Sequence, residues 1–398
     1  MTAMDIGLSG PPALVGGKVM RHALDLMVTD DPRLIESWWR GFEIGATGSP
    51  YQRMDWVRAY LDTVGKAEGE TPRIVIGRDA SGATAFILPL TVRRSGPIRV
   101  AGPVGGSHAN YHAPLWRPGA SFGDPKALLA AIGRLVGADA VAFPFMPRLW
   151  NGEPNPLVPA DAPPSVSRAY RLALGPSGEE TLNRVVSRDG RKKLRQKAKA
   201  LSERGALALR QAATPEEVEA VLATFFAHKA ERRRSIGLPN PFEVQAARDF
   251  LRRACLSGLE SGTPAVEVYG LYAGERLVAT LAGAADPSRL SAMVLSFDAS
   301  DAEIARRSPG DLLVAHLIDE QCRRGRAILD LGVGEARYKD TFCDGVDDLA
   351  DVLVPVTPLG HAYAALAGVR RSGKRFVKQT PWAWSLVTRL RRKRAGGD

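Results

Sequence analysis

The first half of the chain alternates between helical and strand spacing of its apolar residues. Apolar residues recur three and four positions apart over residues 30–42 and again over 51–64, which predicts two amphipathic helices. Residues 72–92 hold two β-rich runs on either side of Asp79-Ala80-Ser81-Gly82, which predicts a hairpin. The remaining elements predicted in this half are a helix at 127–136 and a buried strand at 138–145.

The second half repeats this arrangement after a proline-rich stretch at residues 147–164. Two helices are predicted at 215–234 and 242–259, and a hairpin with an Ala-Gly turn follows at 265–283. Because each hairpin follows a pair of helices, we expect two copies of one plan. The other elements predicted here are strands at 170–174, 289–297 and 327–331 and helices at 181–204 and 309–324.

The loop before the last of these helices has the composition of an anion site. Its sequence is RRSPGDLL, residues 306–313. Ser308 is expected to be the N-cap, Pro309 the first helical residue and Asp311 the acidic member of a capping box. Gly310 lets a ligand approach the backbone, and the free N–H groups, the helix dipole and the two preceding arginines favour phosphate. The loop therefore suits a diphosphate.

Length and composition indicate a globular chain with two domains. The chain has 398 residues, of which 45% are apolar and 24% charged. No apolar run reaches the roughly 18 to 20 residues of a membrane span, and we identify no secretory signal. The three scattered cysteines support neither a disulfide framework nor a zinc ribbon, which fits a reducing cytosol. We expect a lead-in at 1–28, lobes at 29–160 and 165–355, and a basic tail at 356–398.

The net charge of +11 favours anionic partners. Residues 188–199 form a very basic predicted helix, interpreted either as a solvated face or as a surface for a polyanion; it lacks the aromatic residues of a single-strand nucleic-acid platform. Nucleic acid is therefore not expected as a partner. The tail carries ten Lys or Arg residues around Trp382 and Trp384, so we consider both contact with an anionic membrane and simple packing.

Two other kinds of site find little support. His108 and His112 are four residues apart, but Gly105, Gly106 and Pro114 oppose a helix there and no third ligand is evident, so no metal site is expected. The serines and cysteines carry no paired histidine motif, so direct group transfer is favoured over a covalent intermediate.

The second half resembles the GNAT acyltransferase superfamily, most closely the two-lobed bacterial branch associated by name with cellulose biosynthesis (CelD type). The similar motifs are Phe225-Phe226-x-His228-x-x-x-Arg232, the hairpin at 270–280, Ser308-Pro309-Gly310-x-Leu312-Leu313, and Asp330-x-Gly332-x-Gly334 followed by Tyr338-Lys339. Leu88-Pro89-Leu90 and residues 111–115 resemble the first lobe of that branch. The resemblance implies an α/β fold with mixed sheets, built as two tandem GNAT-like lobes, the second catalytic and the first degenerate.

The same resemblance implies that acyl-CoA, with acetyl-CoA as the first expectation, lies between the strands at 289–297 and 327–331. The backbone at 294–298 would pair with pantetheine, and the amides of 308–313 would hold the pyrophosphate. The loop keeps only the arginine and first glycine of the usual GNAT pattern, which leaves other acyl donors open. The residues implied in cofactor binding are Val294, Leu295, Ser296, Arg306, Arg307, Ser308, Gly310, Asp311 and Leu312.

Direct transfer to an amine needs a base that takes a proton from the amine, a hydrogen-bond donor that stabilises the oxyanion, and an acid that protonates the leaving thiolate. Tyr338 is the candidate acid, Asp330 and Glu335 are candidate bases, and His228 titrates in a suitable range. Lys339, Arg232 and Arg233 are candidates for binding an anionic acceptor, with Glu335 as a further substrate residue.

We therefore predict a cytoplasmic acyl-CoA-dependent N-acyltransferase, with a peripheral position at the membrane as an option. Its acceptor would be a small molecule or glycan precursor of envelope polysaccharide metabolism, with an amine or hydroxyl group. Two alternatives stay open: a Fem-type transferase that uses aminoacyl-tRNA, and a non-catalytic accessory module of a polysaccharide synthesis complex.

Overall fold

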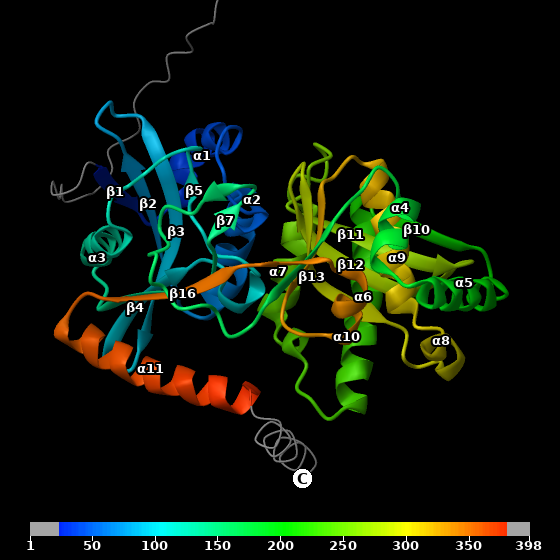
Figure 1. The fold of residues 1–398 in the computed structure, drawn as a ribbon. Coiled ribbons are helices and arrows are strands. Elements are labelled where there is room, and N and C mark those ends of the chain that lie inside the picture. Colours follow the sequence, from blue (N-terminus) through cyan, green and yellow to red (C-terminus); the bar gives the residue numbers. More distant parts are fainter. Residues whose placement is uncertain (1–23, 380–398) are drawn as a thin grey trace, which may run out of the picture.

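Two lobes lie side by side in the computed structural model, which describes residues 24–379 (Figure 1). Within these residues each lobe is built on a seven-stranded sheet, with strand order β1-β2-β3-β4-β6-β16 plus β5 beside β3 in the first lobe, and β10-β11-β12-β13-β14-β9-β15 in the second. Neighbouring strands are antiparallel except β4 with β6 and β13 with β14. The mixed α/β fold predicted from the sequence is thus confirmed.

The first lobe consists of the following elements. Its strands are β1 Asp25–Thr29, β2 Thr71–Arg78, β3 Thr84–Ser95, β4 Ile98–Pro103, β5 Leu115–Trp116 and β6 Ala140–Pro147, and a small separate hairpin is made by β7 Leu149–Trp150 and β8 Glu153–Pro154. Its helical segments are η1 Pro32–Ile35, α1 Glu36–Glu43, η2 Pro50–Gln52, α2 Met54–Tyr60, η3 Leu61–Gly65, η4 Gly106–His108 and α3 Pro125–Leu135.

The second lobe has a similar set. Its strands are β9 Ala169–Ala173, β10 Leu207–Gln211, β11 Val266–Ala273, β12 Arg276–Ala285, β13 Arg289–Phe297, β14 Ile328–Val333 and β15 Gly345–Asp347. Its helical segments are α4 Gly178–Val185, α5 Arg188–Ser202, α6 Pro215–Ser235, η5 Pro241–Glu243, α7 Gln245–Leu256, α8 Ala302–Arg306, α9 Pro309–Arg323 and α10 Arg337–Phe342. The chain then continues into β16 Leu349–Pro355 and α11 Pro358–Gln379.

Both lobes follow one plan. A strand, two helices, a three-strand meander, a helix and a parallel strand occur in the same order, as β1-α1-α2-β2-β3-β4-α3-β6 and as β10-α6-α7-β11-β12-β13-α9-β14. The predicted repeat of two helices and two strands is therefore confirmed. It also includes a strand before the helices and a strand, a helix and a parallel strand after the two strands, which were not part of the predicted repeat.

One strand of the first sheet comes from beyond the second lobe. β9, which precedes the second lobe's own meander, pairs with β14, whereas β16, which follows the whole second lobe, returns to pair with β6 of the first. The second lobe was expected to span residues 165–355. Its last strand, residues 349–355, instead completes the sheet of the first lobe. No local pattern indicates this pairing of β16, since strand partners are set by tertiary packing.

Several local predictions need correction. β1 begins at Asp25 inside the expected lead-in. The helix expected at 51–64 is a chain of three shorter helical segments. The one expected at 181–204 is two helices, because Ser187 caps a new start by accepting from the amide of Gly190. The two hairpins, in contrast, lie where the alternation predicts them.

A continuous apolar core joins the lobes. The buried face of α2 meets the buried face of α7, where the rings of Trp56 and Phe250 contact edge to face with centroids 5.1 Å apart. The Arg53 guanidinium donates to the carbonyls of Thr263, Pro264 and Ala285. These contacts fix the first lobe against α7 and the end of β12 in the second lobe.

α11 packs along β16 and the first lobe (Figure 1). Of the basic residues predicted to contact a membrane, those from 380 onward, with Trp382 and Trp384, lie outside the described residues. Within residues 24–379 no helix is long and apolar enough to cross a membrane.

Candidate functional site

The central feature of the second lobe is a pair of parallel strands that separate. β13 and β14 are paired only at Arg289–Ile328, Leu290–Leu329 and Ser291–Asp330. Beyond Ser291 and Asp330 the two strands no longer pair with each other, although β13 continues to Phe297 and β14 to Val333. The backbone groups on their facing edges are thus not used in pairing between the two strands, which is where a ligand could insert.

A side chain from the first lobe lies at the point of separation. The Asn110 amide donates to the carbonyl of Ala292 on β13 at 2.9 Å and accepts from the amide of Val333 on β14 at 3.4 Å. It also donates to the Tyr51 hydroxyl at 2.8 Å. Asn110 therefore replaces the missing ladder bonds between the strands, and the first lobe sets where the opening starts.

This insertion explains the glycine of the Asp330-x-Gly332 motif. Gly332 has φ of 78°, and a Cβ there would lie 2.7 Å from Nδ2 of Asn110 and 2.9 Å from the Ala292 carbonyl oxygen. Gly334 has φ of 98° but open space around its Cβ position. Both positions thus have a left-handed backbone conformation that favours glycine. Only at Gly332 does the missing side chain also leave space for Asn110 of the first lobe.

We predict that Gly332→Ala costs about 2–4 kcal/mol of unfolding free energy, because backbone strain and the clash with Asn110 add. Gly334→Ala is the matched control and should cost only the strain, about 1 kcal/mol. Urea unfolding of both variants measures the difference. Equal losses would show that Asn110 does not constrain the backbone at Gly332.

A bulge in β13 lies beside the opening. The register with β12 shifts between Ala282 and Gly283, which pair with Val294 and Ala292 and leave Met293 without a partner. A bulge bends the strand that carries it. From Val294 onward β13 therefore runs toward the start of α9, which is the second feature of the site.

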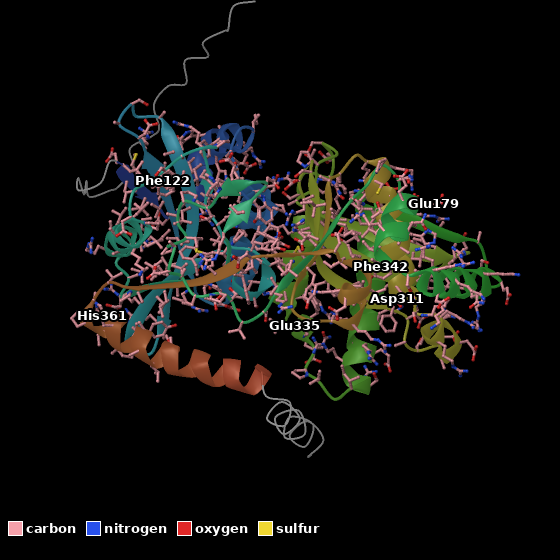
Figure 2. All side chains as sticks on the ribbon, viewed as in Figure 1. Phe122, Glu179, Asp311, Glu335, Phe342 and His361 are labelled. Carbon is pink, nitrogen blue, oxygen red and sulfur yellow. The ribbon has the colours of Figure 1, made fainter. Side chains whose placement is uncertain are left out.

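The start of α9 differs from the capping box that we expected. The helix does begin at Pro309, but Ser308 is in the left-handed region at φ 51° and ψ 60° and its hydroxyl caps no amide. It accepts instead from Nζ of Lys197 on α5 at 2.8 Å. The carboxylate of Asp311 (Figure 2) is 3.7 Å from the same Nζ. Local propensity for a cap was outweighed by this contact with α5.

The backbone of this loop offers fewer amides than predicted. The amides of Asp311 and Leu312 both donate to the Ser308 carbonyl, and the Leu312 side chain is buried in the core. The Gly310 amide donates to no other described residue, and the nearest side-chain atoms to its Cβ position belong to Leu295 and Phe297 of β13. The predicted anion site would therefore consist of one amide, the helix end and the cations around it.

Those cations come from two helices. Arg306 and Arg307 are exposed, and each contacts Glu303, at 3.1 and 4.0 Å. Lys197 adds a charge from α5, which the sequence showed only as one member of a basic run. Its contact with Ser308 could not be predicted, because no local pattern links residues more than a hundred positions apart.

Asp330, a candidate base, lies at the closed end of the opening. It is fully buried, its Oδ2 accepts from Ser291 at 2.7 Å, and its Oδ1 accepts from the Gly332 amide at 2.7 Å. Burial raises its pKa, and Arg289 opposes that effect from 3.6 Å. Every oxygen of this carboxylate is thus used within the fold, which fits a structural role better than proton transfer.

Three other candidates lie on or next to α10. Tyr338 is partly buried, and burial raises its pKa to about 12, so it keeps its proton at neutral pH. The Lys339 amine donates to the carbonyls of Gly332 and Val333 at 3.0 and 3.1 Å. It is therefore engaged with β14 rather than available to an acceptor. Glu335 is exposed in the loop before the helix (Figure 2).

The candidate residues on α6 have different surroundings in the structure. His228 is partly buried with a lowered pKa, caused mainly by burial. Arg232 is exposed, whereas Arg233 faces a cavity. Between them, Lys229 donates to the Leu295 carbonyl of β13 at 3.3 Å. Lys229 was not among the residues predicted for the site, and its one signal was its place among the basic residues near the end of that helix.

The cavity lies between the lobes and has a volume of about 460 Å³. Met293 and Val294 of the bulge line it, as does Asn110 from the first lobe, so it adjoins the point where the strands separate. Among residues 24–379, no group of three or more His, Cys, Asp or Glu side chains is placed to hold a metal ion.

Comparison with known proteins agrees with this geometry. The profile of a family described as acetyltransferase (GNAT) domain matches residues 188–340. The solved structure of FemX superposes with a TM-score of 0.57 at 10% identity, over 82% of this chain and 98% of FemX. The C-terminal domain (DUF2156) of a candidate lysylphosphatidylglycerol synthetase from Agrobacterium fabrum gives 0.50 at 11% identity, over 85% and 96%. No curated protein sequence matches the chain.

The matched residues run from α5 through β14 and into α10, and thus include the separating strands and the start of α9. Because the first lobe repeats the plan of the second, the expectation of two tandem GNAT-like lobes is confirmed, as is that of an enzyme of the GNAT acyltransferase type. The match to the acetyltransferase (GNAT) domain family thus lies in the second of two lobes with the same fold.

Proposed function

We propose that the second lobe binds an acyl-CoA between β13 and β14 and transfers its acyl group directly to an amine or hydroxyl acceptor. Acetyl-CoA is the first donor to test. The observation that supports this most strongly is that the two strands separate after Ser291 and Asp330, while the Gly310 backbone at the start of α9 lies against the far end of β13.

The distance along β13 suits an extended donor. From Val294 at the bulge to Phe297 beside Gly310 the strand advances three residues, or roughly 10 Å at about 3.3 Å per residue. Pantetheine would run along this edge, with its amides on the strand backbone, and would compete with Lys229 for the Leu295 carbonyl. The pyrophosphate would lie at the Gly310 amide, near Lys197 and Arg307.

The protonated hydroxyl of Tyr338 is the proposed source of the proton for the CoA thiolate, because burial keeps its pKa high. We further propose the CelD-type branch and an acceptor from envelope polysaccharide metabolism, on the motifs that the sequence shares with that branch.

The Fem-type alternative rests on one observation. On α5, Arg188, Lys192, Lys193, Arg195 and Lys199 are exposed, and within the described residues none of them forms a salt bridge. Such a face suits the phosphates of tRNA. Filter binding with an aminoacylated tRNA, alongside titration with acetyl-CoA, separates the two donors.

Lys197→Gln tests the donor site itself. The substitution should weaken acetyl-CoA binding about 3- to 10-fold, because it removes one cation beside the pyrophosphate. Lys126→Gln, which removes a surface charge of the first lobe, is the control and should leave the Kd unchanged. Calorimetric titration measures both, and equal affinities in the two variants would contradict the assignment of Lys197.

A further inference from the structure

The cavity between the lobes has walls of different charge. One wall comes from the first lobe, with His108 and Glu68, and the other from α6, with Lys229 and Arg233. Apolar side chains make up much of the remainder, among them Phe250 and Phe242. Because Asn110, Met293 and Val294 also line it, the cavity opens on the place where the proposed acyl-CoA would carry its thioester.

His108 has the surroundings of a proton acceptor. It ends η4, just after Gly105 in the left-handed region, and its ring contacts Phe250 with centroids 5.3 Å apart and Tyr60 at 5.9 Å. Its ring nitrogens bond to no other described side chain or backbone group. Burial lowers its pKa below the ordinary value of about 6.5, and Glu68 opposes this effect. The imidazole is therefore neutral at pH 7 and able to accept a proton.

The opposite wall carries two positive charges. Lys229 and Arg233 lie four residues apart, on one face of α6. Arg233 forms no salt bridge within the described residues, and the pKa of Lys229 is lowered first by burial and then by the Arg233 charge. Two neighbouring cations on a partly apolar wall favour a carboxylate or a phosphate between them.

We infer that this cavity binds the acyl acceptor, and that the acceptor is a primary amine that also carries an anionic group. Lys229 and Arg233 hold the anionic group, the apolar residues hold the body of the molecule, and His108 faces the amine. This assignment rests on the proposed acyl-CoA-dependent activity and adds the acceptor's chemical class and a catalytic residue from the first lobe.

The reaction balances with these groups. His108 takes one proton from the ammonium form of the acceptor, and the neutral nitrogen attacks the thioester carbonyl carbon. A C–N bond forms, the C–S bond breaks, and the thiolate of CoA leaves. A second amine proton goes to the thiolate through the acid of the site, and His108 returns its proton to solvent. The products are an amide, free CoA and one proton.

The experiment uses a matched pair of probes, 4-(aminomethyl)benzoate and 4-(aminomethyl)benzamide, which differ in charge and hardly in size. Ligand-observed NMR measures their binding to the full chain with and without CoA, and thiol release from acetyl-CoA measures transfer. Wild type, Arg233→Gln and His108→Gln are compared, and Arg252→Gln, on the outer groove of α6 and α7, is the control.

Wild type should bind the benzoate about tenfold or more tightly than the benzamide, and Arg233→Gln should reduce that preference severalfold while acetyl-CoA binding is unchanged. His108→Gln should lower kcat for the benzoate about 100-fold with little change in KM. It should also remove the fall in rate that wild type shows as the pH drops below the lowered pKa of His108. Tyr60, Glu68, Lys229 and Arg233 are the other titratable or charged groups that face this ring or its cavity.

Equal binding of the two probes to wild type, or an undiminished preference in Arg233→Gln, would overturn the inference. So would a His108→Gln variant that keeps the wild-type rate and pH profile. Failure of the donor proposal has a different signature, since acetyl-CoA would then not bind wild type at all, whereas the benzoate preference without CoA would still report on the cavity.

Discussion

Replacing Arg289 with methionine is expected to lower the free energy of unfolding by about 3–5 kcal/mol at neutral pH, because it leaves the buried carboxylate of Asp330 without its cation. Arg289 is 3% exposed, and its Nη1 lies 3.0 Å from Asp347 and 3.6 Å from the fully buried Asp330. Its guanidinium also stacks on Trp150 of the first lobe at 4.1 Å. One side chain thus joins the closed end of the strand opening to the other lobe.

The loss should depend on pH in a defined direction. Burial already raises the pKa of Asp330 above the value that this residue has in the unfolded chain. The protonated carboxyl therefore stabilises the fold at low pH, and this contribution is lost as the pH rises through the pKa in the folded state. Without Arg289 that pKa rises further, and the carboxyl must either stay protonated or be buried as an anion. The difference from wild type should therefore shrink toward about pH 4, near the ordinary pKa of aspartic acid.

Arg171→Met is the control for this prediction. Arg171 contacts the same Asp347 at 2.9 Å but is partly exposed, so its loss should cost less than about 1 kcal/mol. Urea unfolding at neutral pH and at about pH 4 gives both quantities. A loss for Arg289→Met that equals the control, or that does not change with pH, would show that the buried ion pair does not stabilise the closed end of the opening.

The second large effect is expected at Gly310. Gly310→Glu should weaken acetyl-CoA binding about 100-fold or more, because it places a carboxylate where the pyrophosphate is proposed to lie. The fold should tolerate the change, since a Cβ at this position meets Leu295 at 3.5 Å and Phe297 at 3.7 Å, both ordinary contacts. Gly310→Ala is the matched control and should keep an affinity within a few-fold of wild type.

The sequence predicts local elements of this fold well and long-range partners poorly. The alternation around Asp79 and the Ala-Gly turn predicted both hairpins, and the β13, α9 and β14 segments lie within a few residues of their expected limits. β16 could not be assigned to the first sheet, because its pairing with β6 joins residues about two hundred positions apart. Strand partners of that kind are decided by packing, which leaves no local pattern.

The site shows the same division. The start of α9 was visible as Pro309 followed by Gly310, yet Ser308 proved to be held by Lys197 instead of capping the helix. Asn110 and His108, which reach the second lobe's opening from the first, lie in a stretch rich in glycine and proline that gave no regular period. Their relevance depends on how the lobes meet, and that contact has no signature in one sequence.

Calorimetric titration of the wild-type chain with acetyl-CoA, run beside Gly310→Ala and Gly310→Glu, tests the central claim most directly. An acyl-CoA site between β13 and β14 predicts saturable binding at a single site in wild type and in Gly310→Ala, and its loss in Gly310→Glu. An absence of heat up to high micromolar acetyl-CoA in wild type, or equal affinity in Gly310→Glu, would contradict it.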